Sequence, residues 1–161
     1  MSTLSNIPFE TFLEITKKKA QYGRYIDTKK WDQLRLLAMP NARFRFNNAD
    51  NTLITRNGQA MDFQSLTSFV DWFSQFFKYA QTLHMFGPPE MSLLSKDEVF
   101  VSWSMEDQIY FHGNDKLSEI RGGGYYCEIW VRKDDSWWLK DLTLTRTYQK
   151  LSIATKVPPM L

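Results

Sequence analysis

The segment LTSFVDWFSQFFKYA, residues 66–80, decides the fold class of this 161-residue chain. Its apolar side chains recur every three or four residues, a spacing that predicts an amphipathic helix with one continuous buried face. This face carries Leu66, Phe69, Val70, Phe73, Phe76, Phe77 and Ala80. Such a face has to pack against other elements to leave water, and the remaining sequence predicts two further helices and a sheet.

The two other helices are expected before this segment. Helical spacing begins at Pro8, which suits a first helical turn, and continues to about Gly23 or Tyr25. A second helical segment follows and ends at Pro40. Asp27, at the junction of the two helices, is a candidate cap for the second.

Strand patterns dominate the second half of the chain. Residues 43–46 alternate basic and aromatic side chains, and Asn57-Gly58 indicates a turn. After a turn at Pro88-Pro89 the period changes to that of strands, at residues 99–103, 109–111, 125–132 and 137–148. This order predicts an α+β fold, with about three helices on a strongly curved, mostly antiparallel sheet that leaves a pocket between the layers.

Composition narrows the class of protein. The 20 basic and 18 acidic residues leave a formal charge of +2, too small and too evenly spread for a nucleic-acid partner. No apolar run approaches the roughly 18 residues of a membrane span, and the single Cys127 offers neither a disulfide nor metal-ligand spacing. We therefore expect a cytoplasmic protein with no membrane partner and no metal. One domain is expected over residues 1–161, with its core at about 9–148 and a tail at 149–161.

His84 and Asp27 are the first candidates for chemistry. His84 lies in an apolar run, where it could act as a general base or be a core histidine bonded to a backbone carbonyl. Asp27 could orient that imidazole or serve only as the helix cap. The residues alone leave both pairs of alternatives open. The other histidine, His112, lies beside Gly113-Asn114 and is interpreted as a solvated loop residue.

Glu128 is the third candidate, because it interrupts a strand that is otherwise apolar. Alternation places it on one face with Gly124, Tyr126 and Trp130. On a covered face, desolvation would raise the pKa of this carboxyl and keep it protonated as an acid. On an open face it would pair with a lysine or arginine of a neighbouring strand. Both remain open.

Other motifs favour plain structural interpretations. Gly122-Gly123-Gly124 leads into a strand without the helix and Lys-Ser/Thr of a phosphate loop, and is interpreted as a turn or bulge. Lys17-Lys18-Lys19 is typical of a solvated helix face. Cys127 has no neighbour that would activate its thiol.

In this context the chain resembles the SnoaL-like branch of the NTF2-like superfamily, and within it the group of fungal scytalone dehydratases. Residues 25–34, YIDTKKWDQL, match that group's Tyr-Asp-x-Lys-x-Trp-Asp-x-Leu segment, and Thr82-Leu83-His84 follows in the same order. Residues 96–99 and 132–137 agree as well, so the resemblance spans roughly residues 9–148. It implies a cone-shaped α+β fold around a pocket.

The resemblance also implies that Asp27 and His84 form the family's cofactor-free aspartate–histidine pair. The chain departs from scytalone dehydratase elsewhere. Ile109 or Tyr110 stands where that enzyme has a second catalytic histidine, and Phe46 replaces a water-binding tyrosine. A serine and an asparagine that hold substrate oxygens become Gly124 and Tyr126.

These observations predict a cofactor-independent isomerase or cyclase of natural-product biosynthesis, acting on a polycyclic, largely apolar intermediate. His84, oriented by Asp27, would remove a proton, and Glu128 would protonate an oxygen. The pocket lining would comprise Tyr22, Trp31, Phe46, Tyr110, Tyr126 and Trp130. The alternatives are a dehydratase and a non-catalytic binding or dimerisation module. A homo-oligomer, either dimer or trimer, is expected because the outer sheet face carries apolar side chains at Tyr125, Ile129 and Val131.

Overall fold

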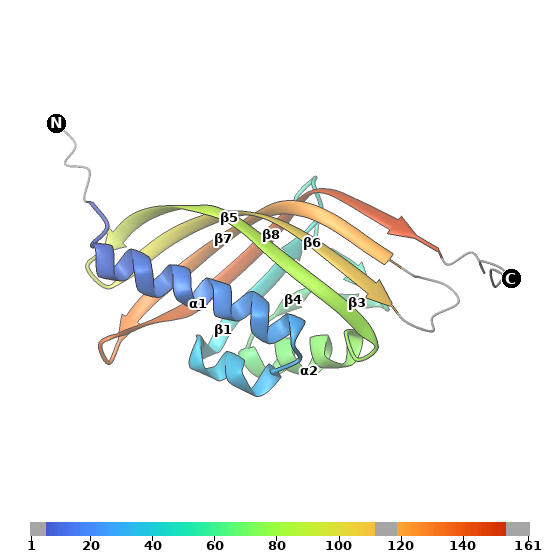
Figure 1. Ribbon diagram of the computed structural model, residues 1–161, viewed down its shortest axis with the longest axis horizontal. Coiled ribbons are helices and arrows are strands. Elements are labelled where there is room, and N and C mark those ends of the chain that lie inside the picture. Colours follow the sequence, from blue (N-terminus) through green and yellow to red (C-terminus); the bar gives the residue numbers. More distant parts are fainter. Residues whose placement is uncertain (1–5, 112–118, 154–161) are drawn as a thin grey trace, which may run out of the picture.

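Helices, a six-stranded sheet and a two-stranded sheet make up the computed structural model, which describes residues 6–111 and 119–153 (Figure 1). The helical elements are α1 (Phe9–Asp27), the 3₁₀ helix η1 (Trp31–Leu36) and α2 (Leu66–Phe76). The long strands are β1 (Ala38–Asn47), β5 (Ala80–Ser95), β6 (Glu98–Phe111), β7 (Glu119–Lys133) and β8 (Ser136–Ser152). Short strands are β2 (Thr55–Arg56), β3 (Gln59–Ala60) and β4 (Asp62–Phe63).

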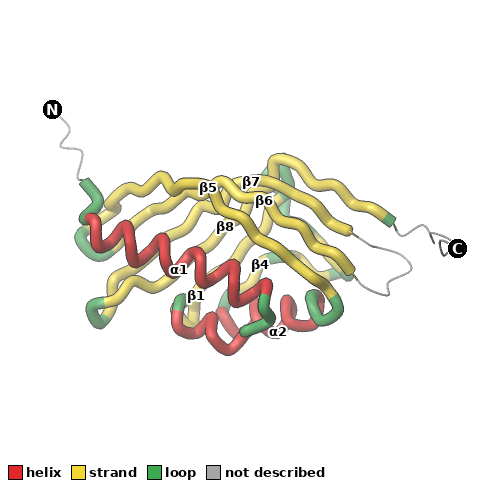
Figure 2. The backbone as a smooth tube through the Cα atoms, in the orientation of Figure 1, coloured by secondary structure: helices red, strands yellow, loops and turns green. Residues whose placement is uncertain are grey.

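The main sheet confirms the predicted α+β fold. Its strand order is β4-β1-β8-β7-β6-β5, and all pairings are antiparallel except the parallel pair β1–β8. The long strands arch over α1, and α2 with η1 lies at the lower end of the arch (Figures 1 and 2). The helices and the curved sheet therefore enclose the interior from two sides.

Pro40, Pro88 and Pro89 lie inside strands, where the sequence predicted interruptions. Pro40 belongs to β1, whose pairing with β8 shifts register between Ala38 and Arg43. The second helical segment is shorter than predicted, because η1 ends at Leu36. Residues 87–89, predicted to form a turn, continue β5 with a register shift, and β5 is the edge strand. Bulges and edges tolerate proline because no ladder hydrogen bond is lost there.

The segment that opened the sequence analysis forms α2, which begins at Leu66 as predicted and ends four residues earlier, at Phe76. Ser65 caps it by accepting a hydrogen bond from the Ser68 backbone N–H at 3.1 Å. Its face meets aromatic residues of the sheet, and the Phe69 ring stacks on Phe44 with centroids 4.2 Å apart. Much of the aromatic content of the chain is therefore used in this contact.

The remaining strand predictions hold with altered bounds. Asn57 and Gly58 both have positive φ, as expected of a two-residue hairpin turn between β2 and β3. Residues 99–111 form one strand, β6, and not two. The glycine run lies in β7, with a bulge between Gly123 and Gly124, so the bulge interpretation is correct. A Cβ atom at Gly124 would lie 2.9 Å from the Arg146 Cα atom, so the close approach of β8 requires glycine there.

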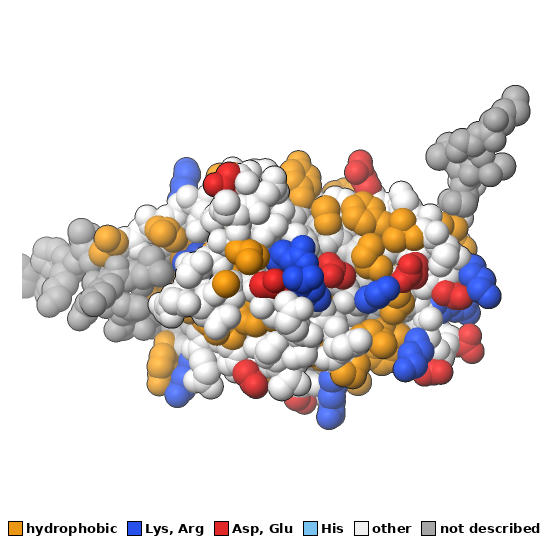
Figure 3. All heavy atoms as spheres, turned by 180° about the vertical axis from the view of Figure 1, so that it is seen from behind, with side chains coloured by type: hydrophobic (Ala, Val, Ile, Leu, Met, Phe, Trp, Pro, Cys, Tyr) orange, Lys and Arg blue, Asp and Glu red, His pale blue; other side chains and the backbone are white. Residues whose placement is uncertain are grey.

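The outer face of the sheet carries the apolar residues on which the oligomer prediction rests. Tyr125 is 52% exposed, and Ile129 and Val131 are half-buried. From behind, hydrophobic patches alternate with acidic and basic clusters (Figure 3). The homo-oligomer stays a prediction. Strand β8 continues to Ser152, past the expected end of the core. Residues 154–161 of the expected tail and His112 lie outside the described residues.

Candidate active site

Asp27 and His84 meet where the end of α1 crosses β5. Gly23, one turn earlier, lies so close to this strand that a Cβ atom there would be 2.8 Å from the Phe86 ring. The missing side chain lets α1 approach β5, and four-residue spacing turns Asp27 toward the same strand. Asp27 Oδ1 lies 2.7 Å from His84 Nδ1. The fold thus joins two residues that are far apart in the sequence.

Hydrogen bonds fix the Asp27 carboxylate and, through it, the imidazole. Thr82 Oγ1 donates to Asp27 Oδ1 at 2.8 Å, and the His84 backbone N–H donates to Oδ2 at 3.0 Å. Since the carboxylate accepts these bonds, His84 Nδ1 carries the proton and Nε2 has the free lone pair. Asp27 does not cap η1, which begins after Lys30 without a side-chain cap. The cap interpretation is therefore wrong.

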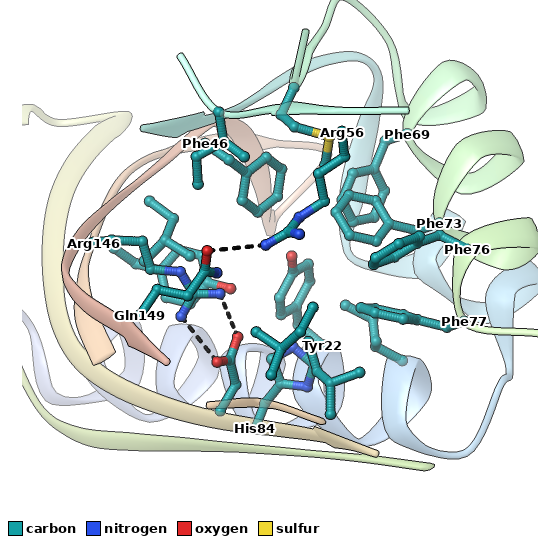
Figure 4. Close-up of a pocket in the computed structure, with 18 residues that line it drawn as sticks. Tyr22, Phe46, Arg56, Phe69, Phe73, Phe76, Phe77, His84, Arg146 and Gln149 are labelled. Carbon is teal, nitrogen blue, oxygen red and sulfur yellow. Dashed lines mark hydrogen bonds and ion pairs between the residues drawn. The ribbon is translucent and has the colours of Figure 1, made fainter. Parts of the chain in front are cut away.

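His84 is on the wall of a tight cavity of about 40 Å³ between the helices and the sheet. Aromatic side chains from α1, β1, α2 and β7 form much of this wall (Figure 4). They are Tyr22, Phe46, Phe69, Phe73, Phe76, Phe77 and Tyr126. Phe46, Tyr22 and Tyr126 were expected in the lining, whereas the α2 phenylalanines were expected only to pack. A lining of this kind suits an apolar ligand.

Two buried phenols stand on this wall. The Tyr22 and Tyr126 rings meet edge to face, with their centroids 6.3 Å apart. Burial raises the pKa of both phenols; the neighbouring Tyr126 adds to the rise for Tyr22, and the Asp107 charge adds to it for Tyr126. Both side chains therefore stay protonated at neutral pH and can donate hydrogen bonds to an oxygen in the cavity.

The raised pKa values give a testable pH dependence of stability. An unfolded tyrosine titrates near pH 10, so a phenol whose folded pKa is higher contributes stability that is complete below pH 10 and is lost above it, by about 1.4 kcal/mol per pH unit. We expect the stability difference between wild type and Tyr126→Phe to shrink as the pH rises above about 10. Urea denaturation from about pH 8 to 11 measures it. Tyr125→Phe, on the exposed face of β7, is the matched control, and a pH-independent difference for Tyr126→Phe would contradict the assignment.

Glu128 lies on the covered face of β7 but not on the cavity. Its carboxylate pairs with the Lys19 ammonium and accepts hydrogen bonds from the indole N–H groups of Trp103 and Trp130, both at 2.9 Å. This carboxylate is 1% exposed and has three donors around it. Glu128 is therefore neither an acid that reaches the substrate nor the partner of a base on a neighbouring strand. Glu128 is instead the counter-ion of a helix lysine.

Lys19 overturns the interpretation of residues 17–19 as a solvated face. It is 1% exposed, and its ammonium lies 3.6 Å from the Tyr126 ring centroid and 4.6 Å from that of Tyr22. Burial lowers the pKa of Lys19, while the adjacent Glu128 acts in the opposite direction. The aromatic faces and the carboxylate together replace the water that this cation loses.

Three of the expected lining residues lie elsewhere. Trp130 is buried behind the wall, where it bonds Glu128. Trp31 stacks on Phe77 at 6.4 Å outside the lining. Tyr110 is 49% exposed, because Ile109 takes the inward position of β6 and alternation turns Tyr110 outward. These three positions are corrections to the sequence-based lining.

The sequence analysis did not identify a cluster of polar side chains at one end of the cavity, formed by Arg56, Asp107, Arg146 and Gln149. Arg146 and Asp107 form a buried bidentate ion pair, with N···O distances of 2.9 and 2.7 Å. Arg56 donates to Gln149 Oε1 at 3.0 Å. Alternation along an unbroken β6 would have marked Asp107 as inward-facing, but the strand was predicted as two pieces that excluded this residue.

Two further features concern membrane-spanning helices and metal-binding side chains. Within residues 6–111 and 119–153, no helix combines the length and apolar character needed to cross a bilayer. Over the same ranges, no three His, Cys, Asp or Glu side chains cluster closely enough to hold a metal ion.

Comparisons with known proteins agree with this architecture. The model of the SnoaL-like domain family matches residues 9–143. "Probable cyclase FGR4" of Gibberella zeae is 35% identical over 144 residues, covering 85% of this chain and 91% of that protein. The chain therefore belongs to the SnoaL-like family of the NTF2-like superfamily.

Solved structures share the fold at low sequence identity. A crystal structure described as "Putative Scytalone Dehydratase" from Novosphingobium aromaticivorans has a TM-score of 0.69 at 14% identity, over 88% of this chain and 87% of that chain. A hexachlorocyclohexane dehydrochlorinase, LinA type 2, has a TM-score of 0.72 at 14% identity, over 94% and 96% of the two chains. At such identities these similarities establish the shared cone-shaped fold alone.

Proposed function

We propose that this protein is a cofactor-independent acid–base enzyme, an isomerase or cyclase acting on a polycyclic, largely apolar intermediate of natural-product biosynthesis. The observation that carries the proposal is the Asp27–His84 pair on the wall of an aromatic cavity. The 35% identity to "Probable cyclase FGR4" over most of both chains supports the reaction class.

Four polar residues act in the proposed mechanism, namely His84, Asp27, Tyr22 and Tyr126. His84 Nε2 takes a proton from a carbon or hydroxyl of the substrate, and Asp27 stabilises the resulting imidazolium through Nδ1–H. Tyr22 and Tyr126 donate hydrogen bonds to the oxygen on which negative charge develops. The imidazolium then returns its proton to another atom of the substrate, so that the product has the composition of the substrate.

The aromatic wall serves the same reaction. Apolar ring faces match a fused-ring substrate in shape and polarity, and they keep water from quenching a reactive intermediate. A dehydratase would use the same pair, with the returned proton leaving as part of a water molecule. A pure binding module has no need of a histidine oriented by a carboxylate toward its cavity.

The test is to delete the gene in the source organism, identify the metabolite that accumulates, and incubate it with the pure protein. An unchanged product mass supports the isomerase or cyclase. Loss of the mass of water instead identifies a dehydratase, and binding without conversion identifies a binding module.

A further inference from the structure

The polar end of the cavity carries more positive than negative charge. Arg56 and Arg146 both line it, and Asp107 is the acidic residue among the lining side chains. Figure 4 shows Arg56 reaching inward from the top, with Arg146 and Gln149 on one side and Phe69, Phe73, Phe76 and Phe77 on the other. Two guanidinium groups facing one carboxylate leave one positive charge in a mostly apolar space.

The hydrogen bonding of the two arginines is incomplete. Both terminal nitrogens of Arg146 are used by Asp107, but its Nε atom is buried and has no hydrogen-bond partner among the described residues. Arg56 has an amide oxygen of Gln149 as an acceptor and the Phe76 ring 5.8 Å away, not a carboxylate. Burial and the nearby Arg146 charge lower the pKa of Arg56. An anion beside Arg56 would relieve the repulsion between the two guanidinium groups.

The local structure accommodates the Arg146 guanidinium at a cost in folding stability. Gly122 lies opposite Arg146, and a Cβ atom there would be 2.6 Å from Arg146 Nη1, so this glycine leaves room for the guanidinium. Arg146 is 9% exposed and Asp107 2%. Buried charges are destabilising unless they are fully paired, so an ion pair combined with a second arginine at the end of a cavity indicates a binding role.

We propose that Arg56 and Arg146 form a subsite for an anionic oxygen of the substrate, namely a carboxylate or the enolate of a β-dicarbonyl group. This inference rests on the proposed function, because it assigns the substrate class of the same cavity. The ring system would lie along the phenylalanines, with the anionic oxygen at the arginines. If His84 removes a proton from the carbon next to a carbonyl group, the electron pair of that C–H bond moves onto the carbonyl oxygen, which Tyr22 and Tyr126 would hold, while the two arginines hold the separate anionic group.

Binding of a matched pair of unreactive probes tests the subsite without turnover. We choose 2-naphthoate and 2-naphthamide, which share the ring system and differ in charge, and follow quenching of tryptophan fluorescence. Charge-assisted hydrogen bonds predict that wild type binds the carboxylate at least about tenfold more tightly than the amide. In Arg56→Gln this preference should fall below about threefold. Arg35→Gln, which removes an exposed arginine of η1, is the matched control and should keep the wild-type preference.

Arg56 is half-exposed on a short hairpin, so Arg56→Gln should fold, and urea denaturation of each variant checks it. Equal affinity for both probes, a preference that survives in Arg56→Gln, or no binding of either probe at millimolar concentration would overturn the subsite. His84→Ala separates this result from the proposed function. Retained carboxylate preference with full turnover in that variant removes the catalytic proposal and leaves the anion subsite standing.

Discussion

Replacing His84 with alanine is expected to lower turnover by about 10²- to 10⁴-fold, the range for loss of a general base. The variant should stay folded, because the His84 ring lines a cavity and, within the part of the chain that the structure describes, its side chain hydrogen-bonds only Asp27. The measurement is the rate of conversion of the accumulated metabolite, with circular dichroism to check folding. His112→Ala, which removes the other histidine of the chain, is the matched control and should retain activity.

Asp27→Asn extends this prediction. An amide in this position no longer favours Nδ1–H over Nε2–H, so the basic nitrogen is no longer held toward the cavity, and turnover should fall by a similar factor. Full activity of His84→Ala would remove the base from the mechanism. Full activity of Asp27→Asn with an inactive His84→Ala would leave the base and remove the orienting role.

Glu128→Gln is expected to lower the free energy of unfolding by about 3–5 kcal/mol, because it leaves the buried Lys19 ammonium without a counter-ion. This expected loss of stability differs from the sequence-based role of Glu128, which was to protonate an oxygen of the substrate. Urea denaturation measures the change. In the double variant Lys19→Met with Glu128→Gln, no ammonium is left without a counter-ion and the amide oxygen still accepts from the Trp103 and Trp130 indoles, so most of the lost stability should return.

The double variant also separates structure from catalysis. A stable and active double variant would assign the pair to the core, as the three donors around Glu128 indicate. A Glu128→Gln protein that is as stable as wild type but inactive would contradict this account and restore the carboxyl as a catalytic acid.

The fold could be predicted to a large extent because its main signals are local. The three-to-four spacing of α2 and the Asn57-Gly58 turn depend on neighbouring residues, and the structure confirms both. The errors arose where tertiary position overrides a local rule. Residues 87–89 would break a central strand, yet they fit β5 because this strand is at the edge and bulges there.

The sequence predicted some site residues and missed others, again because tertiary position can override a local rule. Asp27 and His84 were marked by their types, their contexts and the family resemblance, and the structure places them in contact. Lys19 looks like any surface lysine, because its partner Glu128 lies 109 residues away on another element. Burial of such a charge depends on a distant partner, which periodicity along one element does not reveal.

The central claim is that Asp27 holds His84 with Nδ1 protonated and Nε2 free to accept a proton. Two-bond ¹H–¹⁵N spectra of protein labelled in its two histidines measure this directly and need no substrate. The spectrum of His112→Ala assigns the signals. At a pH where the ring is neutral, the account predicts the Nδ1–H form for His84 in wild type and a shift toward Nε2–H in Asp27→Asn. A wild-type His84 protonated at Nε2, with a bare Nδ1 atom, would contradict it.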